Sequence, residues 1–340
     1  MRELVFVGKA RLEWHEHEDL RIAGDGQAIV RPIASTACDL DRRIVAGQVP
    51  FEPPFPIGHE CVAEVMETGE RVETVRRGDI VVVPWHICCG ICGTCRRGLT
   101  AHCEAVPGPI NGYGISMGPR YGGLFSEQVR VPFADGMLVK VPQGLDPVAV
   151  ASASDNLTDA YMAVARGLAK HQGAAVLIVG GVESLGLFAV QHAIANGAAS
   201  VDFVDPDERR RVSAASFGAH VHAALSESFT SRFLVVIGAS RNPAMLGAAI
   251  RCLAPGGHLS NVALYFGDTP LPLWDFYQRD ASFTMGMPSV RAHISTVLEL
   301  ARCGHIQPMK IMTPHPWDSA PEALLELDIK PVMVRPALLS

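Results

Sequence analysis

Four cysteines with metal-ligand spacing are the most conspicuous chemical feature of this chain. Cys89, Cys92, Cys95 and Cys103 follow the pattern C-x2-C-x2-C-x7-C, which allows one loop to surround a single tetrahedral ion with four thiolates. Such a closed site leaves no position for a substrate, so the pattern predicts a structural zinc rather than a reaction centre. Cys88 directly precedes the group, but the spacing favours Cys89 as the ligand.

A second candidate metal site has ligands that are far apart in the sequence. Cys38 in TACDLD, His59 in IGHEC and Asp155 in SASDNL supply a thiolate, an imidazole and a carboxylate. Three ligands of these types suit zinc and leave a fourth position for water or a substrate. Each residue alone is weak evidence, since a lone cysteine is more often part of a core than a ligand.

A glycine-containing turn after the apolar run AAVLIVGG (174–181) is a candidate cofactor site. The turn leads into a helix, and Asp205 ends the next predicted strand about twenty residues later, which is the arrangement that binds dinucleotides. The helix start would lie under the pyrophosphate and the acid would bind the adenosine ribose. The predicted cofactor contacts in this region are Gly181, Glu183, Ser184, Leu185, Gly186, Asp205 and Arg210.

Two features of this region leave alternatives open. Glu183 occupies the middle position of G-x-G-x-x-G, where a glycine normally lets the backbone approach the pyrophosphate. Its side chain either turns to solvent and leaves binding unchanged, or it weakens or alters cofactor binding. Asp205 favours NAD because a carboxylate repels a 2'-phosphate, whereas an arginine of the run Arg209–Arg211 could hold that phosphate, so NADP is possible.

The elements that position these residues change character near residue 150. Before it, short β segments such as 28–33, 61–69 and 79–85 alternate with turns. After a predicted helix over 148–169, strands and helices alternate, which predicts an α/β doubly wound parallel sheet of the Rossmann type. The expected strands are 174–181, 200–205, 232–240 and 258–265, and the expected helices are 185–198, 208–219 and 244–257.

Composition limits the class of protein. A chain of 340 residues favours two domains. The net charge of -6, without a basic run, speaks against nucleic acid or an anionic membrane as a partner. The first residues lack the apolar core of a signal peptide, and no apolar stretch approaches a membrane span. Nine cysteines, several of them clustered like ligands, favour a reducing compartment, so we expect a cytoplasmic protein.

Together these motifs resemble the zinc-containing alcohol dehydrogenases of the medium-chain dehydrogenase/reductase family. The resemblance covers essentially the whole chain, in order, and its motifs are Cys38-x-x-Asp41, Gly58-His59-Glu60, the four-cysteine lobe, the dinucleotide region and the ending KPVMVRP (330–336). It implies a mostly β, GroES-like catalytic domain over 1–152 with a zinc lobe at 86–106. It also implies a Rossmann domain over 153–289, after which residues 290–340 return to the catalytic domain.

The resemblance also implies roles for single residues. Cys38, His59 and Asp155 become ligands of a catalytic zinc, and Glu60 becomes an alternating or outer carboxylate. Asp41 would accept a hydrogen bond from the far nitrogen of His59.

Beyond the metal site, the resemblance implies that Lys330 presents its charge to the pyrophosphate. A homodimer or homotetramer, formed by sheet extension near 258–266, is expected as well. The implied activity is hydride transfer between NAD(H) and a small alcohol or carbonyl substrate bound to zinc.

The chain departs from the family where the alcohol proton usually leaves. Leu40 and Arg43 stand at the relay positions, and neither is an ordinary proton relay group. Another route through Glu60, water or the cofactor ribose is one explanation. A reductase of an imine or activated double bond, which needs no such proton transfer, is a second. An impaired enzyme, or a non-catalytic binding protein that keeps the fold, is a third.

The substrate itself stays open. Trp85 and Leu40 predict an apolar wall near the metal, and Phe51 and Phe55 either extend this wall or pin a surface loop. Polar groups that could line the same pocket are Asp39, Arg42 and Arg120. These residues do not decide between a secondary alcohol, a polyol and a more complex metabolite.

Overall fold

The computed structural model describes residues 1–106, 108–115, 121–326 and 328–336 and divides into two compact units. Unit 1 comprises Met1–Thr158, Pro288–Arg302 and the chain from Met312 onward, and unit 2 comprises Asp159–Met287 and Cys303–Ile311. The segment 303–311 was expected in the first domain. It belongs to unit 2 because Gln307 exchanges two hydrogen bonds with Gln191, of 2.7 and 3.2 Å.

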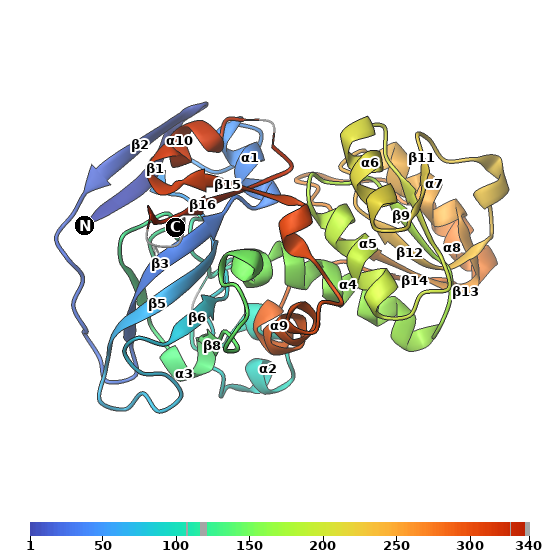
Figure 1. The fold of residues 1–340 in the computed structure, drawn as a ribbon. Helices are drawn as coiled ribbons and strands as arrows, with labels where there is room; N and C mark the ends of the chain where they lie inside the picture. The colour runs from blue at the N-terminus through green and yellow to red at the C-terminus, as the bar shows by residue number, and fades with distance from the viewer. Residues whose placement is uncertain (107, 116–120, 327, 337–340) are drawn as a thin grey trace. The chain divides into compact units, whose positions relative to one another are not determined.

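Unit 1 is built on two sheets, as the short β segments predicted. The smaller has the order β2 (Arg11–Glu16), β1 (Arg2–Gly8), β4 (Phe55–Pro56). The larger has the order β15 (Met312–Pro316), β16 (Lys330–Val334), β3 (Ala28–Thr36), β5 (Glu60–Thr68), β6 (Ile80–Val83), β8 (Val139–Lys140), and β7 (Val129–Val131) also pairs with β3. The C-terminal strand β16 thus lies antiparallel to β3, beside it in Figure 1.

Unit 2 contains a six-stranded sheet in which every neighbouring pair is parallel. Its order is β11 (His220–His222), β10 (Val201–Val204), β9 (Val176–Val179), β12 (Phe233–Gly238), β13 (Leu253–Asn261), β14 (Ser282–Thr284). From β9 the chain adds β10 and β11 on one side of this strand, and it then adds β12, β13 and β14 on the other side. This arrangement confirms the predicted doubly wound sheet and makes the gap between β9 and β12 its switch point.

Helices cover both faces of the unit 2 sheet, with α5 and α6 on one face and α7 and α8 on the other (Figure 1). The helices are α1 (Asp39–Val45), α2 (Gly93–Arg96), α3 (Ala134–Met137), α4 (Asn156–Lys170), α5 (Leu185–Ala195), α6 (Glu208–Ser216), α7 (Pro243–Arg251), α8 (Leu273–Arg279), α9 (Ile294–Arg302) and α10 (Ala320–Ala323). The 3-10 turns are η1 (Thr100–His102), η2 (Val148–Ser154), η3 (Glu227–Phe229), η4 (Val290–Ala292), η5 (Pro308–Lys310) and η6 (Trp317–Ser319). Within the described ranges, none of the helices has the length and apolar character needed to cross a bilayer.

Two expectations about elements need correction. The predicted helix over 148–169 is divided at Asp155, whose backbone angles of φ -155° and ψ -91° separate η2 from α4. This break directs the chain so that Asp155 lies at the end of a turn rather than within a helix. Sheet extension was expected near 258–266, but β13 is paired on both sides, and the edge strands of the sheet are β11 and β14.

Candidate active site and metal centres

Three segments of unit 1 bring Cys38, His59 and Asp155 together. β3 and β5 pair with Thr36 opposite Glu60, so the residues that follow β3 and precede β5 lie at the same edge of the sheet. Cys38 caps α1, His59 stands just before β5, and the break before α4 delivers Asp155. One ligand atom from each of the three lies within 4.8 Å of the other two, and all three residues are buried.

The chemistry of this group fits a metal ion. The Cys38 Sγ and His59 Nε2 atoms lie 3.1 and 3.5 Å from Oδ2 of Asp155, so a thiolate, an imidazole and a carboxylate converge on one point. On the other side of the ring, His59 Nδ1 faces Asp41 Oδ1 at 3.4 Å. Both atoms are buried and have no hydrogen-bond partner among the described residues, so Asp41 is the group able to orient the imidazole, as predicted for a zinc ligand.

Without a cation, the burial and the mutual charges of these residues shift the pKa values of Cys38 and His59. Burial, together with the charge of Asp155, raises the pKa of the Cys38 thiol well above its usual value. Burial opposes protonation of His59, but Asp41, Asp155 and Glu60 outweigh it and raise the pKa of this imidazole to about 9. A divalent cation would relieve both effects, because it binds the thiolate and the neutral imidazole.

Zinc uptake at this site is therefore expected to depend on pH. The pKa of His59 in the metal-free folded chain is about 9, above its ordinary 6.5, so zinc must displace a proton at neutral pH. The apparent affinity should rise by at least about tenfold per pH unit from pH 6.5 towards 9. The raised pKa stabilises the metal-free fold below pH 6.5, and this contribution is lost as the pH rises through 9. Competition with a chelator at several pH values measures the slope, and a flat profile would contradict the expected proton release.

Glu60 and Lys330 form a buried ion pair beside the ligand group. Lys330 Nζ lies 2.9 and 3.0 Å from the two carboxylate oxygens of Glu60, and Thr36 donates a hydrogen bond to the same carboxylate. Burial raises the pKa of Glu60 to about 7, against the opposing charge of Lys330. Glu60 therefore lies outside the group of three ligand atoms, in the place of an outer carboxylate.

The position of Lys330 corrects one sequence-based expectation. Lys330 was expected to face a pyrophosphate, but its side chain is fully buried in unit 1. Its ammonium donates to Glu60 and, at 2.8 Å, to Asn156 Oδ1. The pKa of Lys330 is raised because Glu60 and Asp39 outweigh the opposing effect of burial, so the group stays charged where it is.

Asn156 connects the whole group, although the sequence did not single it out. Its Nδ2 atom donates to Cys38 Sγ and to Asp155 Oδ2, both at 3.2 Å, and its backbone N–H donates to Glu60 Oε1 at 3.2 Å. Its Oδ1 atom accepts from Lys330. The only signal in the sequence was its place next to Asp155 and at the start of a helix, where asparagine is common for other reasons.

The four-cysteine group is the second candidate metal centre. The Sγ atoms of Cys89, Cys92, Cys95 and Cys103 lie within 4.8 Å of one another. Cys88 points elsewhere, towards the carbonyl of Gly136 at 3.6 Å. A hydrogen bond between Thr94 and Cys92 lowers the pKa of that thiol to about 5, which favours the thiolate that a metal requires. The short elements α2 and η1 are all the helical structure that this loop carries between Cys89 and Cys103.

The predicted cofactor loop joins β9 to α5 in unit 2. Gly180 has φ +85°, and Val182 and Glu183 also adopt left-handed angles of +32° and +49°. A Cβ atom at Gly186 would lie 2.6 Å from the carbonyl oxygen of Gly180, so only glycine allows the helix to approach the strand this closely. This is the helix-packing role of the last glycine in a dinucleotide fingerprint. Ser184 and Leu185 are both buried at the helix start.

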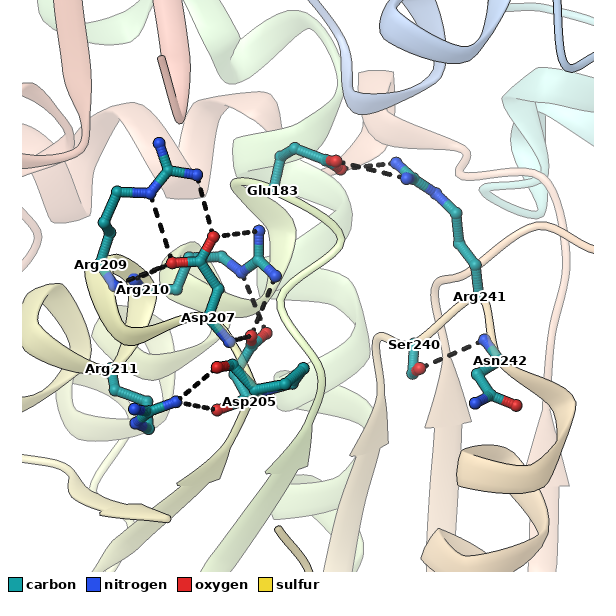
Figure 2. A network of polar contacts seen from close by, with 10 residues as sticks. Glu183, Asp205, Asp207, Arg209, Arg210, Arg211, Ser240, Arg241 and Asn242 are labelled. Carbon is teal, nitrogen blue, oxygen red and sulfur yellow. Dashed lines mark hydrogen bonds and ion pairs between the residues drawn. The ribbon is translucent and has the colours of Figure 1, made fainter. Parts of the chain in front are cut away.

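Asp205 and Arg210 lie beside this loop and bind each other (Figure 2). Arg210 Nε donates to Oδ2 of Asp205 at 3.0 Å, and its terminal nitrogen donates to Oδ1 at 2.9 Å. A Cβ at Gly181 would lie 2.5 Å from the Arg210 side chain, so Gly181 makes room for this arginine. Arg209 instead pairs with Asp207, and Arg211 donates to the backbone carbonyls of Asp205 and Pro206.

One of the two alternatives for Glu183 was that its side chain points to solvent. In the structure, the side chain is instead paired with Arg241. Arg241 donates to both of its carboxylate oxygens, at 2.5 and 3.3 Å, and Figure 2 shows the two side chains end to end. Arg241 follows β12, which is the strand beside β9, so both residues stand at the switch point of the sheet. The sequence missed Arg241 because its pairing depends on that strand order.

The residues at the family's relay positions, which are not relay groups here, and the residues predicted for the substrate pocket have different surroundings. Leu40 is partly buried and donates its N–H to Cys38 Sγ at 3.3 Å, whereas Arg43 donates to the carbonyl of Gln48. Trp85 is buried, and its indole N–H bonds the carbonyl of Pro288 at 2.9 Å. Phe55 packs edge-on against Phe6 of β1 and belongs to a core, and Phe51 packs on Phe55. Arg120 lies outside the described residues.

Known proteins with similar sequences and structures are zinc-binding dehydrogenases and alcohol dehydrogenases. Residues 24–143 match the alcohol dehydrogenase GroES-like domain, and residues 184–302 match the zinc-binding dehydrogenase domain. The chain is 28% identical over 320 residues to a probable zinc-binding alcohol dehydrogenase of Mycobacterium tuberculosis, covering 92% of this chain and 81% of that protein. It is 30% identical over 263 residues to the L-threonine 3-dehydrogenase of Pyrococcus abyssi, covering 73% and 72%. The alcohol dehydrogenase of Thermus sp. ATN1 superimposes with a TM-score of 0.87 at 30% identity, over 98% of this chain and 100% of that one.

Proposed function

This chain belongs to the zinc-containing alcohol dehydrogenases of the medium-chain dehydrogenase/reductase family, and we propose that it transfers a hydride between NAD(H) and a small alcohol or carbonyl substrate. It is a zinc-dependent oxidoreductase by family. The observation that supports the reaction site is the buried group of Cys38, His59 and Asp155. When bound, a zinc ion would supply Lewis-acid chemistry to the substrate oxygen, and the nicotinamide would accept or return the hydride.

The protein groups at this site have separable tasks. Cys38, His59 and Asp155 would hold the ion, and Asp41 would fix the orientation of the imidazole through Nδ1. Asn156 would hold the thiolate and the carboxylate in place through Nδ2. Because these side chains are buried, they would keep bulk water away from a bound ion.

Glu60 is the candidate proton acceptor on the route that Leu40 and Arg43 do not provide. Its carboxylate has a pKa raised by burial to about 7, so it can take up and release a proton at Oε1 or Oε2 near neutrality. Lys330 and Thr36 hold the carboxylate while its charge changes. Oxidation of an alcohol by NAD+ yields a carbonyl compound, NADH and one proton, and this proton is the one that Glu60 would receive.

NAD rather than NADP is proposed as the cofactor. Asp205 is buried beside the loop, and its carboxylate would repel a 2'-phosphate. Arg210 is already engaged by both oxygens of Asp205, which leaves it less available to a phosphate.

A second copy of the chain is proposed as the macromolecular partner, because Leu273, Trp274 and Tyr277 of α8 expose 70%, 66% and 77% of their surface.

A substrate panel with both cofactors tests the proposal. Alcohols, aldehydes and ketones are offered with NAD(H) and NADP(H), and the absorbance of the reduced nicotinamide is followed. We expect turnover with NAD(H) and two zinc ions per chain. If only imines or conjugated double bonds are turned over, the protein is a reductase of these groups. If neither dinucleotide binds, the protein is a non-catalytic binding protein with the dehydrogenase fold. Sedimentation measures the oligomeric state.

A further inference from the structure

Glu183 places a carboxylate where the proposed cofactor would bring two phosphates. The loop after β9 leads directly into α5, and the start of the helix at this place is where doubly wound sheets bind a pyrophosphate. The middle residue of the fingerprint is the one that the pyrophosphate approaches most closely. A free carboxylate at this position would repel the phosphates, so a chain that binds dinucleotides must restrain it.

The described part of the chain contains such a restraint. Arg241 holds both oxygens of Glu183, at 2.5 and 3.3 Å, in a pair that is only partly exposed, with 30% of the arginine and 21% of the glutamate side chain accessible. Two planar groups joined by two parallel hydrogen bonds have one preferred orientation, which fixes where the carboxylate points. The pair is therefore more restrictive than a single surface contact between long side chains.

The sheet order explains why Arg241 can reach Glu183. β9 and β12 are parallel neighbours, and the N–H of Ala239 bonds the carbonyl of Val179 at 2.8 Å. The two loops that follow these strands are in contact, since a Cβ at Gly180 would lie 2.7 Å from the Cβ of Ser240. Asn242 then caps α7 with a bond to the N–H of Ala244, which anchors the segment that carries Arg241.

We propose that Arg241 is a positioning residue of the cofactor site: by holding the Glu183 carboxylate, it keeps this negative charge away from the pyrophosphate of a nicotinamide dinucleotide. The inference rests on the proposed function, because it presumes that a dinucleotide binds at the loop. It differs from direct phosphate recognition, in which Arg241 itself would bond the phosphate. In the role proposed here, Arg241 matters only while residue 183 carries a charge.

A double-mutant cycle separates these roles. The Kd for NADH is measured by fluorescence titration for the full-length wild type, Arg241→Gln, Glu183→Gln and the double variant. We expect Arg241→Gln to raise the Kd about tenfold, because the released carboxylate repels the phosphates. The same change in the Glu183→Gln background should raise it no more than about twofold, so that Glu183→Gln rescues the loss. The tenfold loss should shrink at high salt.

Other outcomes are equally decisive. An equal loss in both backgrounds would overturn the proposal in favour of direct phosphate binding, and no loss in either would show that the pair is incidental. Arg251→Gln, an exposed arginine at the end of α7, controls for the general loss of one positive charge and should leave the Kd unchanged. Thermal unfolding of each variant checks the fold. If the wild type binds neither NADH nor NADPH, the proposed function fails instead.

Discussion

His59→Ala should abolish zinc-assisted turnover and lower the zinc content from two ions per chain to one. The imidazole supplies one of three buried ligand atoms, and Asp41 is placed to orient it. Without it, the thiol of Cys38, whose pKa burial raises well above its usual value, has little to keep it ionised. A loss of at least about a thousandfold in kcat/KM is expected, since Lewis-acid stabilisation of the substrate oxygen contributes several kcal/mol.

Zinc content by mass spectrometry and initial rates measure this effect. His305→Ala, an exposed histidine of unit 2, is the matched control and should keep both ions and full activity. The fold should survive, because the four-cysteine centre keeps its own ligands. Retention of two zinc ions with full turnover in His59→Ala would rule out the proposed reaction site.

Cys103→Ser should destabilise unit 1 without altering the reaction site. Residues 86–106 contain little secondary structure of their own, so the four thiolates and their ion must hold the loop. The same loop contributes Ile87, Cys95 and Val106 to a hydrophobic core with strands β5 and β6. Release of the ion should lower the thermal midpoint by more than about 5 °C, or roughly 2 kcal/mol for a unit of this size.

Differential scanning calorimetry and zinc analysis test this second expectation. Cys303→Ser removes an exposed cysteine that lies outside both metal centres and serves as the control. The remaining folded fraction of Cys103→Ser should keep its activity per reaction-site zinc. An unchanged midpoint together with the loss of one zinc would mean that the lobe folds without its ion.

Local patterns predicted much of the architecture. Regular β-α-β alternation and the turn before α5 depend on hydrophobic periodicity and glycine spacing, which are properties of contiguous residues. The four-cysteine site could also be predicted from contiguous residues, because one loop supplies the thiols of Cys89, Cys92, Cys95 and Cys103. The division of 148–169 at Asp155 was missed because a 3-10 turn and an α-helix have similar apolar content.

The metal group of Cys38, His59 and Asp155 could be suspected from the sequence, but residue types and spacing alone could not establish it. Its members come from three segments that meet only through the pairing of β3 with β5 and the break before α4. The resemblance to a known family supplied what spacing could not. Asn156 and Thr36 were missed, because an amide or hydroxyl becomes informative only when its partners are known.

The sequence by itself determined the fold class and the four-cysteine lobe, and it supplied candidate residues for a second metal site and for a dinucleotide. Tertiary structure alone decided which charges meet. It turned Lys330 from an expected phosphate contact into the buried partner of Glu60, and it joined Glu183 to Arg241 across the switch point. The physical reason is that both pairs depend on the order of strands, with Lys330 and Glu60 on strands that flank β3 and Glu183 and Arg241 in the loops after β9 and β12. No short stretch of the chain specifies that order.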